Sequence, residues 1–384
     1  MIAVTLTLAL IVALAFINIQ VYTLFSIQKP EEKPEKPEEY PLVSVLLAAR
    51  NEEQNIERCL DALTALDYPD GKLEILVGDD NSSDRTFEIA ARISEQHHHV
   101  QLISIKETMG LARGKANVLA HLAKEASGEI FLITDADVAV PEQWARAMVG
   151  SFTPEVGIVS GTTTCARGRF FETMQSIDWL HFMGYIKAFA NAGRSCTAVG
   201  NNMAVRAEAY SQTGGFENLK FSITEDYRLF QAVTSKGWKW YNNLDSNTLG
   251  VARPITGLKE LLHQRKRWLI GARDLSLFWK TMLVLYVAFT PALFAILFVN
   301  PNLGFFVWFV KFFLQVTFIS VLIRRTESRH FRLSAYLLYE LFVLINSPLS
   351  AMFYLLPVAT IWKGRVYSST DLVEEGRGTN EPQT

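Results

Sequence analysis

The stretch IFLITDAD, residues 130–137, decides the fold class. An apolar run that ends in threonine comes first, and Asp135 and Asp137 follow it. A short, continuous apolar run bounded by polar residues is typical of a parallel strand that is buried on both faces. The stretch therefore predicts a buried strand over residues 130–134 that delivers two carboxylates to its carboxyl end.

Similar apolar runs precede this stretch, and helical patterns separate them. The predicted strands are residues 43–49 (VSVLLAA), 73–77 (LEILV) and 100–105, and the predicted helices are residues 56–66, 85–95 and 114–126. This alternation predicts an α/β domain with a mostly parallel sheet over residues 41–255. Ligands of such sheets bind outside the carboxyl ends of the strands, so the residues that follow each strand are candidates for a site.

Polar residues follow the first two predicted strands as well. They are Arg50-Asn51-Glu52-Glu53 after the first strand and Asp79-Asp80, with Asp84, after the second. Asp84 fits the N-cap of the helix that starts near residue 85, and we favour that interpretation. Asp79 and Asp80 are adjacent carboxylates, which repel one another unless donors or cations compensate them. They are therefore better candidates for a binding site.

The pair Asp135 and Asp137 indicates a divalent metal site. Mg²⁺ and Mn²⁺ prefer oxygen ligands and are typically held by one or two carboxylates plus substrate phosphates. The sequence contains no glycine-rich phosphate loop of the P-loop or dinucleotide type. We therefore expect a nucleotide to be held through Mg²⁺ or Mn²⁺.

Two further groups of polar residues lie downstream. Thr224-Glu225-Asp226 precedes a helical stretch, where an N-cap with acids in the first turn is the alternative to a catalytic role. Residues 256–280 predict a basic amphipathic helix that contains Gln264-Arg265-Lys266-Arg267-Trp268. A basic, tryptophan-containing helix directly before an apolar run is typical of the membrane interface.

The composition limits the classes of function. The 37 Lys and Arg residues nearly balance the 39 Asp and Glu residues, so no nucleic-acid partner is expected. The three cysteines are too few and too scattered for a disulfide framework or a zinc site. The apolar residues gather instead at the two ends of the chain, which indicates a membrane protein.

Residues 1–27 carry no charged side chain and are long enough to span a bilayer. A cleaved signal peptide would need a basic residue before the apolar run, so we favour an uncleaved anchor. The first basic residues, beginning with Lys29, come after it. The positive-inside rule then places the N-terminus outside and the following domain in the cytoplasm. Residues 28–40, rich in Pro and Glu, predict an extended linker.

The C-terminal part, residues 281–362, is apolar again. Residues 281–299 and 304–323 predict two spans, and the arginines that follow them should be cytoplasmic. Residues 333–362 contain Pro348 and Pro357 and fit either one kinked span or a re-entrant hairpin. Basic residues after this stretch favour the hairpin, with the polar tail of residues 363–384 in the cytoplasm.

Taken in order, these motifs resemble the membrane-anchored family 2 glycosyltransferases of GT-A fold. That family includes cellulose, chitin and hyaluronan synthases and ceramide glucosyltransferase. The matching motifs are VSVLLAARNEE, ILVGDDNSSD, GKANVLA, TDAD, the Thr-Glu-Asp of residues 224–226 and the Q-x-x-R-W of residues 264–268. Each motif alone is weak evidence, but their common order over residues 41–268 is specific.

The resemblance implies an inverting transfer of a sugar from a nucleotide-sugar donor, with UDP-sugar expected, to a lipid or glycan acceptor at the membrane. Asp226 would be the general base. The other implied catalytic residues are Glu225, Gln264, Arg267 and Trp268, the implied donor-binding residues are Ala49, Arg50, Asn51, Glu52, Asp79, Asp80, Lys115, Asp135 and Arg265, and the implied metal ligands are Asp135 and Asp137. We expect a multi-pass protein of a bacterial inner membrane.

Two departures from the family pattern argue against processive polymer synthesis. Asn81 stands where glycine is commoner, and Gly200-Asn201-Asn202 stands where several processive synthases carry a Cys-Gly motif. The alternatives are a processive polysaccharide synthase and a catalytically inactive scaffold of the same fold. The sequence leaves open the donor sugar and base, the acceptor, and the oligomeric state, including a homo-oligomer.

Overall fold

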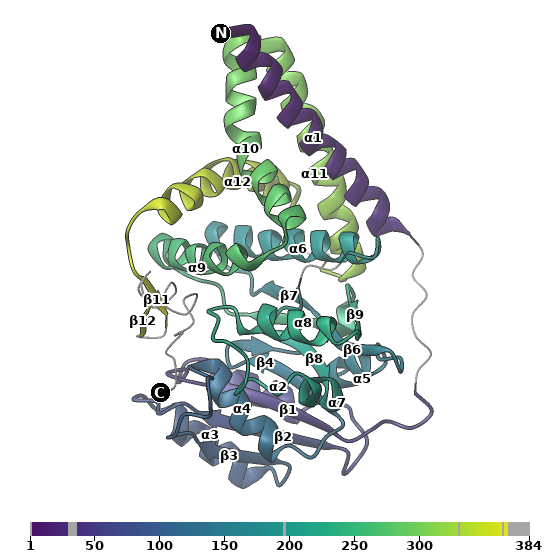
Figure 1. Ribbon diagram of the computed structural model, residues 1–384, viewed down its shortest axis with the longest axis vertical. Helices are drawn as coiled ribbons and strands as arrows, with labels where there is room; N and C mark the ends of the chain where they lie inside the picture. Colours follow the sequence, from purple (N-terminus) through teal and green to yellow (C-terminus); the bar gives the residue numbers. More distant parts are fainter. Residues whose placement is uncertain (1, 30–36, 195–196, 329–330, 363–364, 368–384) are drawn as a thin grey trace, which may run out of the picture.

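A computed structural model describes residues 2–29, 37–194, 197–328, 331–362 and 365–367. An α/β unit carries a group of long helices at one end (Figure 1). The predicted linker of residues 28–40 and the predicted tail of residues 363–384 lie largely outside the described residues.

Seven strands form the central sheet, in the order β3-β2-β1-β4-β8-β6-β9. The strands are β1 (Val43–Ala49), β2 (Leu73–Asp79), β3 (Val100–Ser104), β4 (Ile130–Asp135), β6 (Val156–Ser160), β8 (Asn202–Arg206) and β9 (Lys239–Asn242). All neighbours are parallel except β8, which is antiparallel to β4 and β6. The predicted α/β fold with a mostly parallel sheet is confirmed. Ala49 pairs with Asp79, and Ala48 pairs with Asp135, so the loops after β1, β2 and β4 leave the sheet at one edge.

Helices cover both faces of this sheet. One face holds α2 (Ile56–Thr64), α3 (Thr86–Gln96) and α5 (Trp144–Val149), and the other holds α4 (Lys115–Glu125), α7 (Ala207–Gln212) and α8 (Glu225–Ser235). Within β1, Val45 and Leu47 are buried in the first core, and Leu46 is buried in the second. Because both faces are covered, the strand is a continuous apolar run without polar alternation.

A second, three-stranded sheet and a long helix follow β4 on the side of the long helices. The sheet consists of β5 (Val138–Ala139), β10 (Leu249–Ala252) and β7 (Thr162–Cys165), and the helix is α6 (Phe170–Ala190). No helix was predicted over the residues of α6. Ile177 and Leu180 pack against the long helices, whereas Trp179 and Met183 belong to the core of the sheet. A helix that is buried on opposite sides lacks the single apolar stripe that predicts an amphipathic helix.

The predicted interfacial helix of residues 256–280 is divided. It consists of α9 (Leu258–Gly271), a short 3₁₀ turn (Ala272–Asp274) and the first turn of α10 (Leu277–Val299). At the end of α9, a Cβ atom on Gly271 would lie 2.3 Å from Cγ2 of Thr224. Glycine therefore lets α9 pass close to the start of α8.

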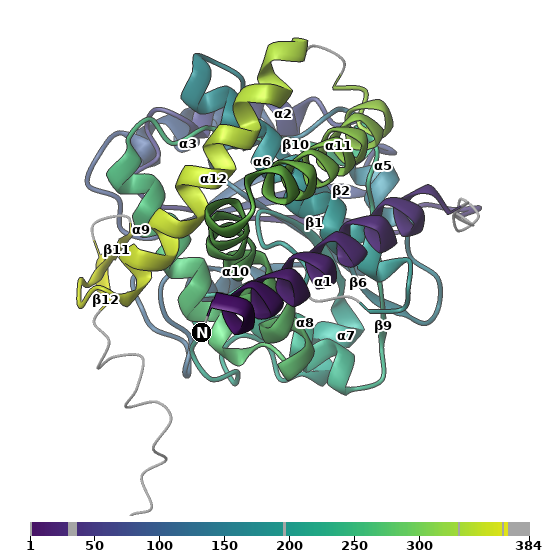
Figure 2. The same ribbon diagram turned by 90° about the horizontal axis from the view of Figure 1, so that it is seen from above.

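Four described helices are long and apolar enough to cross a membrane: α1 (Ile2–Gln28), α10, α11 (Pro301–Arg325) and α12 (Leu333–Leu355). In Figures 1 and 2, α1, α10 and α11 rise together from the α/β unit, whereas α12 lies across their base. α12 is continuous through Pro348, and Pro357 follows its end. The re-entrant hairpin expected for residues 333–362 therefore does not form, because packing between α6, α9 and α12 outweighs the one hydrogen bond that a proline removes.

Candidate active site

A cavity of about 1360 Å³ starts at the carboxyl edge of the central sheet and continues between the long helices. Its sheet end is lined by Ala49, Arg50, Glu52, Asp80, Lys115, Asp135, Asp137, Glu225 and Asp226. Its helix end is lined by residues of α1, α10 and α12, among them Phe16, Ile19, Val284, Ala288, Pro291 and Val343. At the sheet end, the structure thus brings together predicted residues from five separate parts of the chain.

The two adjacent aspartates after β2 take different positions. Asp80 lines the cavity, and its Oδ2 atom lies 3.8 Å from Nη1 of Arg50. Asp79 is buried, and its Oδ2 atom accepts a hydrogen bond from the backbone N–H of Ser82 at 3.1 Å. Of these two predicted donor-binding residues, Asp80 is the one that lines the cavity.

Asn51 and Asp84 hold the loops after β1 and β2 together. Asn51 has a φ of 51°, a left-handed conformation that asparagine tolerates, and its Oδ1 accepts from the backbone N–H of Ser83 at 2.9 Å. Asp84 accepts from the backbone N–H of Thr86 at 3.0 Å and from that of Glu53 at 3.1 Å. The N-cap of α3 is Arg85, so the predicted N-cap role of Asp84 is wrong by one position. Asp84 instead holds the first residue of α3, Thr86, from the position before the cap.

Lys115, the first residue of α4, connects two of the predicted acids. Its Nζ atom lies 2.5 Å from Oδ1 of Asp135 and 3.2 Å from Oε1 of Glu225, and it donates to the carbonyl of Gly200 at 2.9 Å. Burial alone would lower the pKa of Lys115, but the two carboxylates outweigh burial and raise that pKa. The ammonium group is therefore a fixed positive charge at the sheet end of the cavity.

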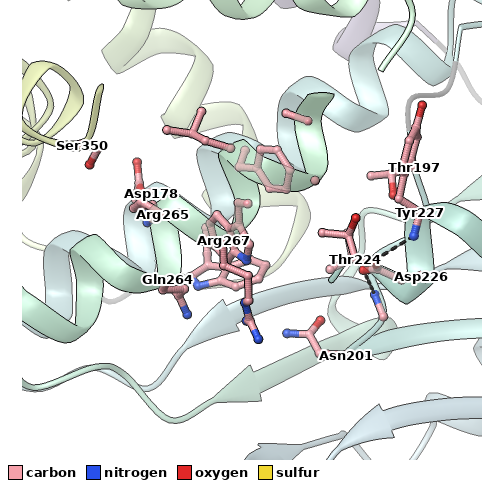
Figure 3. Close-up of a pocket in the computed structure, with 18 of the residues that line it drawn as sticks. Asp178, Thr197, Asn201, Thr224, Asp226, Tyr227, Gln264, Arg265, Arg267 and Ser350 are labelled. Carbon is pink, nitrogen blue, oxygen red and sulfur yellow. Dashed lines mark hydrogen bonds and ion pairs between the residues drawn. The ribbon is translucent and has the colours of Figure 1, made fainter. Parts of the chain in front are cut away.

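Asp226 is held by backbone hydrogen bonds on both of its carboxylate oxygens. Oδ2 accepts from Gly200 N–H at 2.7 Å, and Oδ1 accepts from Tyr227 N–H at 2.8 Å (Figure 3). Burial and the neighbouring Glu225 raise the pKa of Asp226 to about 6, and Lys115 opposes this rise. A carboxylate with this pKa is ionised at neutral pH and is more basic than an ordinary aspartate. It is suited to accept a proton.

Helix α9 forms one wall of the cavity through Gln264, Arg267 and Trp268. The side chain of Arg267 points toward the sheet in Figure 3. The ring of Trp268 meets that of Trp179 edge-on at 5.1 Å and stacks on that of Phe182 at 6.2 Å. The α9 wall is thus a guanidinium next to an aromatic cluster, at the junction of the two ends of the cavity.

Arg265 lies on the same helix but is turned toward α6. Its Nη2 atom donates to Oδ2 of Asp178 at 2.5 Å, and its guanidinium carbon lies 4.3 Å from the centre of the Trp268 ring. Its charge is therefore balanced inside the protein, and a direct contact of Arg265 with a donor stays a prediction.

Comparison with known protein families decides the relationship of this chain. The model of glycosyl transferase family 21 matches residues 5–371. The chain belongs to glycosyl transferase family 21. The resemblance to membrane-associated glycosyltransferases of GT-A fold is thereby confirmed.

The names of curated relatives of this family 21 chain describe synthases of different products. The chain is 28% identical over 245 residues to beta-monoglucosyldiacylglycerol synthase of Synechocystis sp.. The aligned residues cover 63% of this chain and 50% of that protein. It is 29% identical over 247 residues to poly-beta-1,6-N-acetyl-D-glucosamine synthase of Staphylococcus aureus, which is 62% of this chain and 57% of that protein. The chain thus spans about half the length of the curated relatives it matches.

A solved structure shares the fold of the family 21 chain. The mannosyltransferase PcManGT from Pyrobaculum calidifontis, in complex with GDP-Man and Mn²⁺, superposes with a TM-score of 0.58 at 20% sequence identity. The match covers 91% of this chain and 97% of the mannosyltransferase. It therefore includes the α/β unit and the long helices, and it confirms the GT-A fold.

The two aspartates after β4 fit a divalent cation that the substrate helps to bind. Asp135 and Asp137 both line the cavity, and the described residues contain no group of three or more Asp, Glu, His or Cys side chains that could enclose a metal. Mg²⁺ and Mn²⁺ sites of transferases commonly use one or two carboxylates, with phosphate oxygens completing the shell. The pair is consistent with such a shared site.

The sequence analysis missed the contribution of α6 to the family 21 site. Asp178, Trp179 and Phe182 all line the cavity and contact the α9 wall. The signal in the sequence was Asp178, an acid directly before a tryptophan in a stretch rich in large apolar residues. Without a predicted helix to place it on, that signal carried no spatial information.

Proposed function

We propose that this chain is an inverting, metal-dependent glycosyltransferase that moves a sugar from a nucleotide-sugar donor, with UDP-sugar expected, to a membrane lipid. The observation that carries the proposal is the single cavity that joins the acidic sheet end to the apolar helix end. A polar nucleotide fits the first, and the hydrocarbon chains of a lipid fit the second. Donor and acceptor would then meet beside Asp226 and Trp268.

Asp226 is the proposed general base. It would take the proton of the acceptor hydroxyl while that oxygen forms a bond to the anomeric carbon and the bond to the diphosphate breaks. Backbone N–H groups of Gly200 and Tyr227 fix both oxygens of the carboxylate, so its direction is set before substrate binds. The adjacent Glu225 is engaged by Lys115. With Glu225 engaged by Lys115 and with Asp135 and Asp137 assigned to the metal, a single base at Asp226 favours a one-step displacement with inversion.

Positive charge around the sheet end would stabilise the departing diphosphate. Lys115 and Arg267 both line the cavity and are the proposed cations of the chain itself. Mg²⁺ or Mn²⁺ held by Asp135 and Asp137 would add Lewis-acid stabilisation of the same charge. The Mn²⁺ in the structure of the similar mannosyltransferase supports this assignment. Loss of one such stabilising group typically costs on the order of 10²–10³ in rate.

We place the α/β unit in the cytoplasm and the N-terminus outside. α1 begins at the end of the helical group far from the sheet and runs toward it, and α11 returns to the sheet side (Figure 1). Lys29 follows α1, and Arg324 and Arg325 lie in the last turn of α11. Both basic segments therefore lie on the sheet side, in agreement with the positive-inside rule. Nucleotide sugars are cytoplasmic metabolites, which fits this orientation.

Two alternatives remain as outcomes of the test. A processive polysaccharide synthase is the first, and the similarity to poly-beta-1,6-N-acetyl-D-glucosamine synthase motivates it. A catalytically inactive scaffold is the second, but the acids at the sheet end are intact and mutually connected. An apolar helix end favours a lipid acceptor over a channel for a hydrated polymer.

The test uses purified full-length protein in nanodiscs with Mn²⁺ and a panel of UDP-glucose, UDP-galactose, UDP-N-acetylglucosamine and GDP-mannose. Release of nucleoside diphosphate identifies the donor. Mass spectrometry of the lipid fraction, with 1,2-dioleoylglycerol, a ceramide or a total lipid extract as acceptor, identifies the product. A lipid carrying one sugar supports the proposal, and a ladder of sugars indicates the processive alternative. Donor binding without turnover under all acceptors would overturn the assignment as an enzyme.

A further inference from the structure

A chain of hydrogen bonds links α12 to α9 through α6. Tyr339 of α12 donates through its hydroxyl to Oδ1 of Asp178 at 2.9 Å, and the other carboxylate oxygen accepts from Arg265 of α9 at 2.5 Å. Tyr339 is fully buried, and the side chains of Arg265 and Asp178 are only 14% and 17% exposed. These contacts join residues that lie up to 161 positions apart in the sequence.

Arg265 extends this chain to the aromatic wall of the cavity. Its guanidinium lies over the Trp268 ring, and the same ring packs edge-on against Trp179, the residue that follows Asp178. A guanidinium over an indole is attracted by the electrons of the ring when the two are stacked at this distance. The position of Trp268 therefore depends on where Asp178 holds Arg265.

The neighbouring residue of α12 fixes this helix from the opposite side. Glu340 accepts hydrogen bonds from Lys311 and Gln315 of α11 and from the indole N–H of Trp308. Glu340 and Lys311 are almost fully buried, at 1% and 2% exposure. Ionisable side chains in such surroundings are stable only when paired, so this contact defines one position for α12 along α11.

A role in stability alone accounts poorly for the Arg265–Asp178 pair. Buried ion pairs repay their desolvation only partly, and apolar residues of similar volume commonly replace them without loss of stability. The location of this pair is more informative. Asp178, Arg265 and Trp268 all line the cavity, at the junction of the sheet end and the helix end.

We propose that Asp178 and Tyr339 are positioning residues for transfer to the acceptor. They hold Arg265 against Trp268. Because Glu340 fixes α12 on α11, the position of α12 then determines the position of this part of the cavity wall. The acceptor hydroxyl would be presented to Asp226 at this wall. This inference rests on the proposed function, because it assigns the Trp268 wall to the acceptor. The donor-binding residues at the sheet end lie outside this chain of contacts. Arg265, the predicted donor-binding residue within it, is turned toward Asp178, so we expect donor affinity to change little when the chain is broken.

The test compares Asp178→Asn and Tyr339→Phe with Tyr336→Phe, a control that removes a hydroxyl one turn earlier on α12. The measured quantities are the apparent KM for the acceptor lipid, the KM for the donor, and donor hydrolysis without acceptor. Misplacement of a substrate-contacting group by about 1 Å can cost on the order of 10²-fold in rate. We expect Asp178→Asn to raise the acceptor KM by about 10- to 100-fold. Tyr339→Phe removes the contacts of one hydroxyl with Asp178 and His181 and should raise it by about fivefold. The donor KM, donor hydrolysis and the Tyr336→Phe control should stay within about twofold, the scatter that small surface changes produce.

The double variant Asp178→Asn with Arg265→Gln separates positioning from stability. It removes the unpaired charge that the single variant leaves behind, so thermal stability should recover. The acceptor KM should remain high, because the uncharged glutamine does not stack on Trp268 as the guanidinium does. Recovery of stability and KM together would overturn the inference, as would equal losses of acceptor transfer and donor hydrolysis in the single variants.

Failure of this inference is distinguishable from failure of the proposed function. Wild-type turnover with unchanged kinetics in Asp178→Asn and Tyr339→Phe would overturn the positioning role and leave the transferase assignment standing. No wild-type turnover with any lipid acceptor would overturn both.

Discussion

The two ends of the cavity meet opposite physical demands. At the sheet end, Lys115, Asp135, Glu225 and Asp226 form one connected set of charges. At the helix end the walls of α1 and α10 are largely apolar, and the charged pair of Lys311 and Glu340 is closed inside the helical group. The first region exposes charge to a ligand, whereas the second neutralises it within the protein.

This difference teaches where catalysis and stability reside. Charged side chains at the sheet end are held by backbone groups and by one another, and they contribute to substrate binding and catalysis. The buried pair of Lys311 and Glu340 does not contact the cavity wall assigned to the donor, and it contributes to stability by fixing α12 against α11. Substitutions in the two regions should therefore change different measured quantities.

Asp226→Asn should give the largest effect on activity. The amide keeps the size of the side chain but can accept only one of the two backbone N–H bonds, from Gly200 and Tyr227, and it does not accept a proton at neutral pH. Loss of a positioned general base typically costs 10²- to 10⁴-fold, so we expect kcat for transfer to fall by about that factor. Isothermal titration should show UDP affinity within about threefold of the wild type, since small changes outside the binding contacts are near neutral. The control is Asp61→Asn on the exposed face of α2, and retention of a large fraction of kcat in Asp226→Asn would exclude this residue as the base.

Glu340→Leu and Lys311→Met should instead lower stability. Each leaves a buried charge without its partner, and breaking a buried ion pair in this way costs about 3–5 kcal/mol. The double variant removes both charges and should recover most of that free energy. Denaturant titration in detergent, followed by the loss of helical circular dichroism, measures the three variants. If each single variant is as stable as the wild type, the pair does not hold α12 on α11.

The sheet end could largely be predicted from sequence, because its residues follow directly from local patterns. A buried parallel strand is predicted by a continuous apolar run, and the residue after the run lies at the carboxyl edge of the sheet. Asp80, Asp135 and Asp137 were located in this way before any tertiary contact was known. The sequence could not show which of Asp79 and Asp80 lines the cavity. That depends on the fold of the loop after β2, which is held to the loop after β1 by the bond between Ser83 and Asn51.

The helix end could not be predicted beyond its apolar composition. Its walls come from α1, α6, α10 and α12, whose mutual positions depend on contacts between residues far apart in the chain. The position of α12 across the base of the other helices is an example, since its hydropathy resembles that of a span. Tyr339 and Glu340, which fix that position, are adjacent in sequence, yet their partners lie on α6 and α11.

Ala288→Trp should lower acceptor transfer without changing donor hydrolysis, and this effect should be smaller than that of Asp226→Asn. Ala288 lines the helix end, and a large side chain there would occupy the volume that a lipid chain needs. Because overpacking of this kind is local, we expect acceptor transfer to fall by about 10- to 50-fold while donor hydrolysis is unchanged. The matched control is Val299→Trp, at the partly exposed end of the same helix. Equal loss of transfer and hydrolysis in Ala288→Trp would mean that the helix end does not hold the acceptor.

The pH dependence of kcat/KM should give the smallest effect, and it directly tests the network of Lys115 and Asp226. The pKa of Asp226 is raised from the ordinary 3.8 to about 6, so the base gains a proton as the pH falls through 6. At pH 5 about one molecule in ten keeps an ionised base, and kcat/KM should be about tenfold lower than at pH 8. An aspartate with an ordinary pKa would remain ionised at pH 5 and give a flat profile over this range. Lys115→Met removes the cation that opposes the rise, so the acidic limb of its residual activity should move to higher pH. A limb that stays in place would mean that Lys115 and Asp226 do not belong to one electrostatic network.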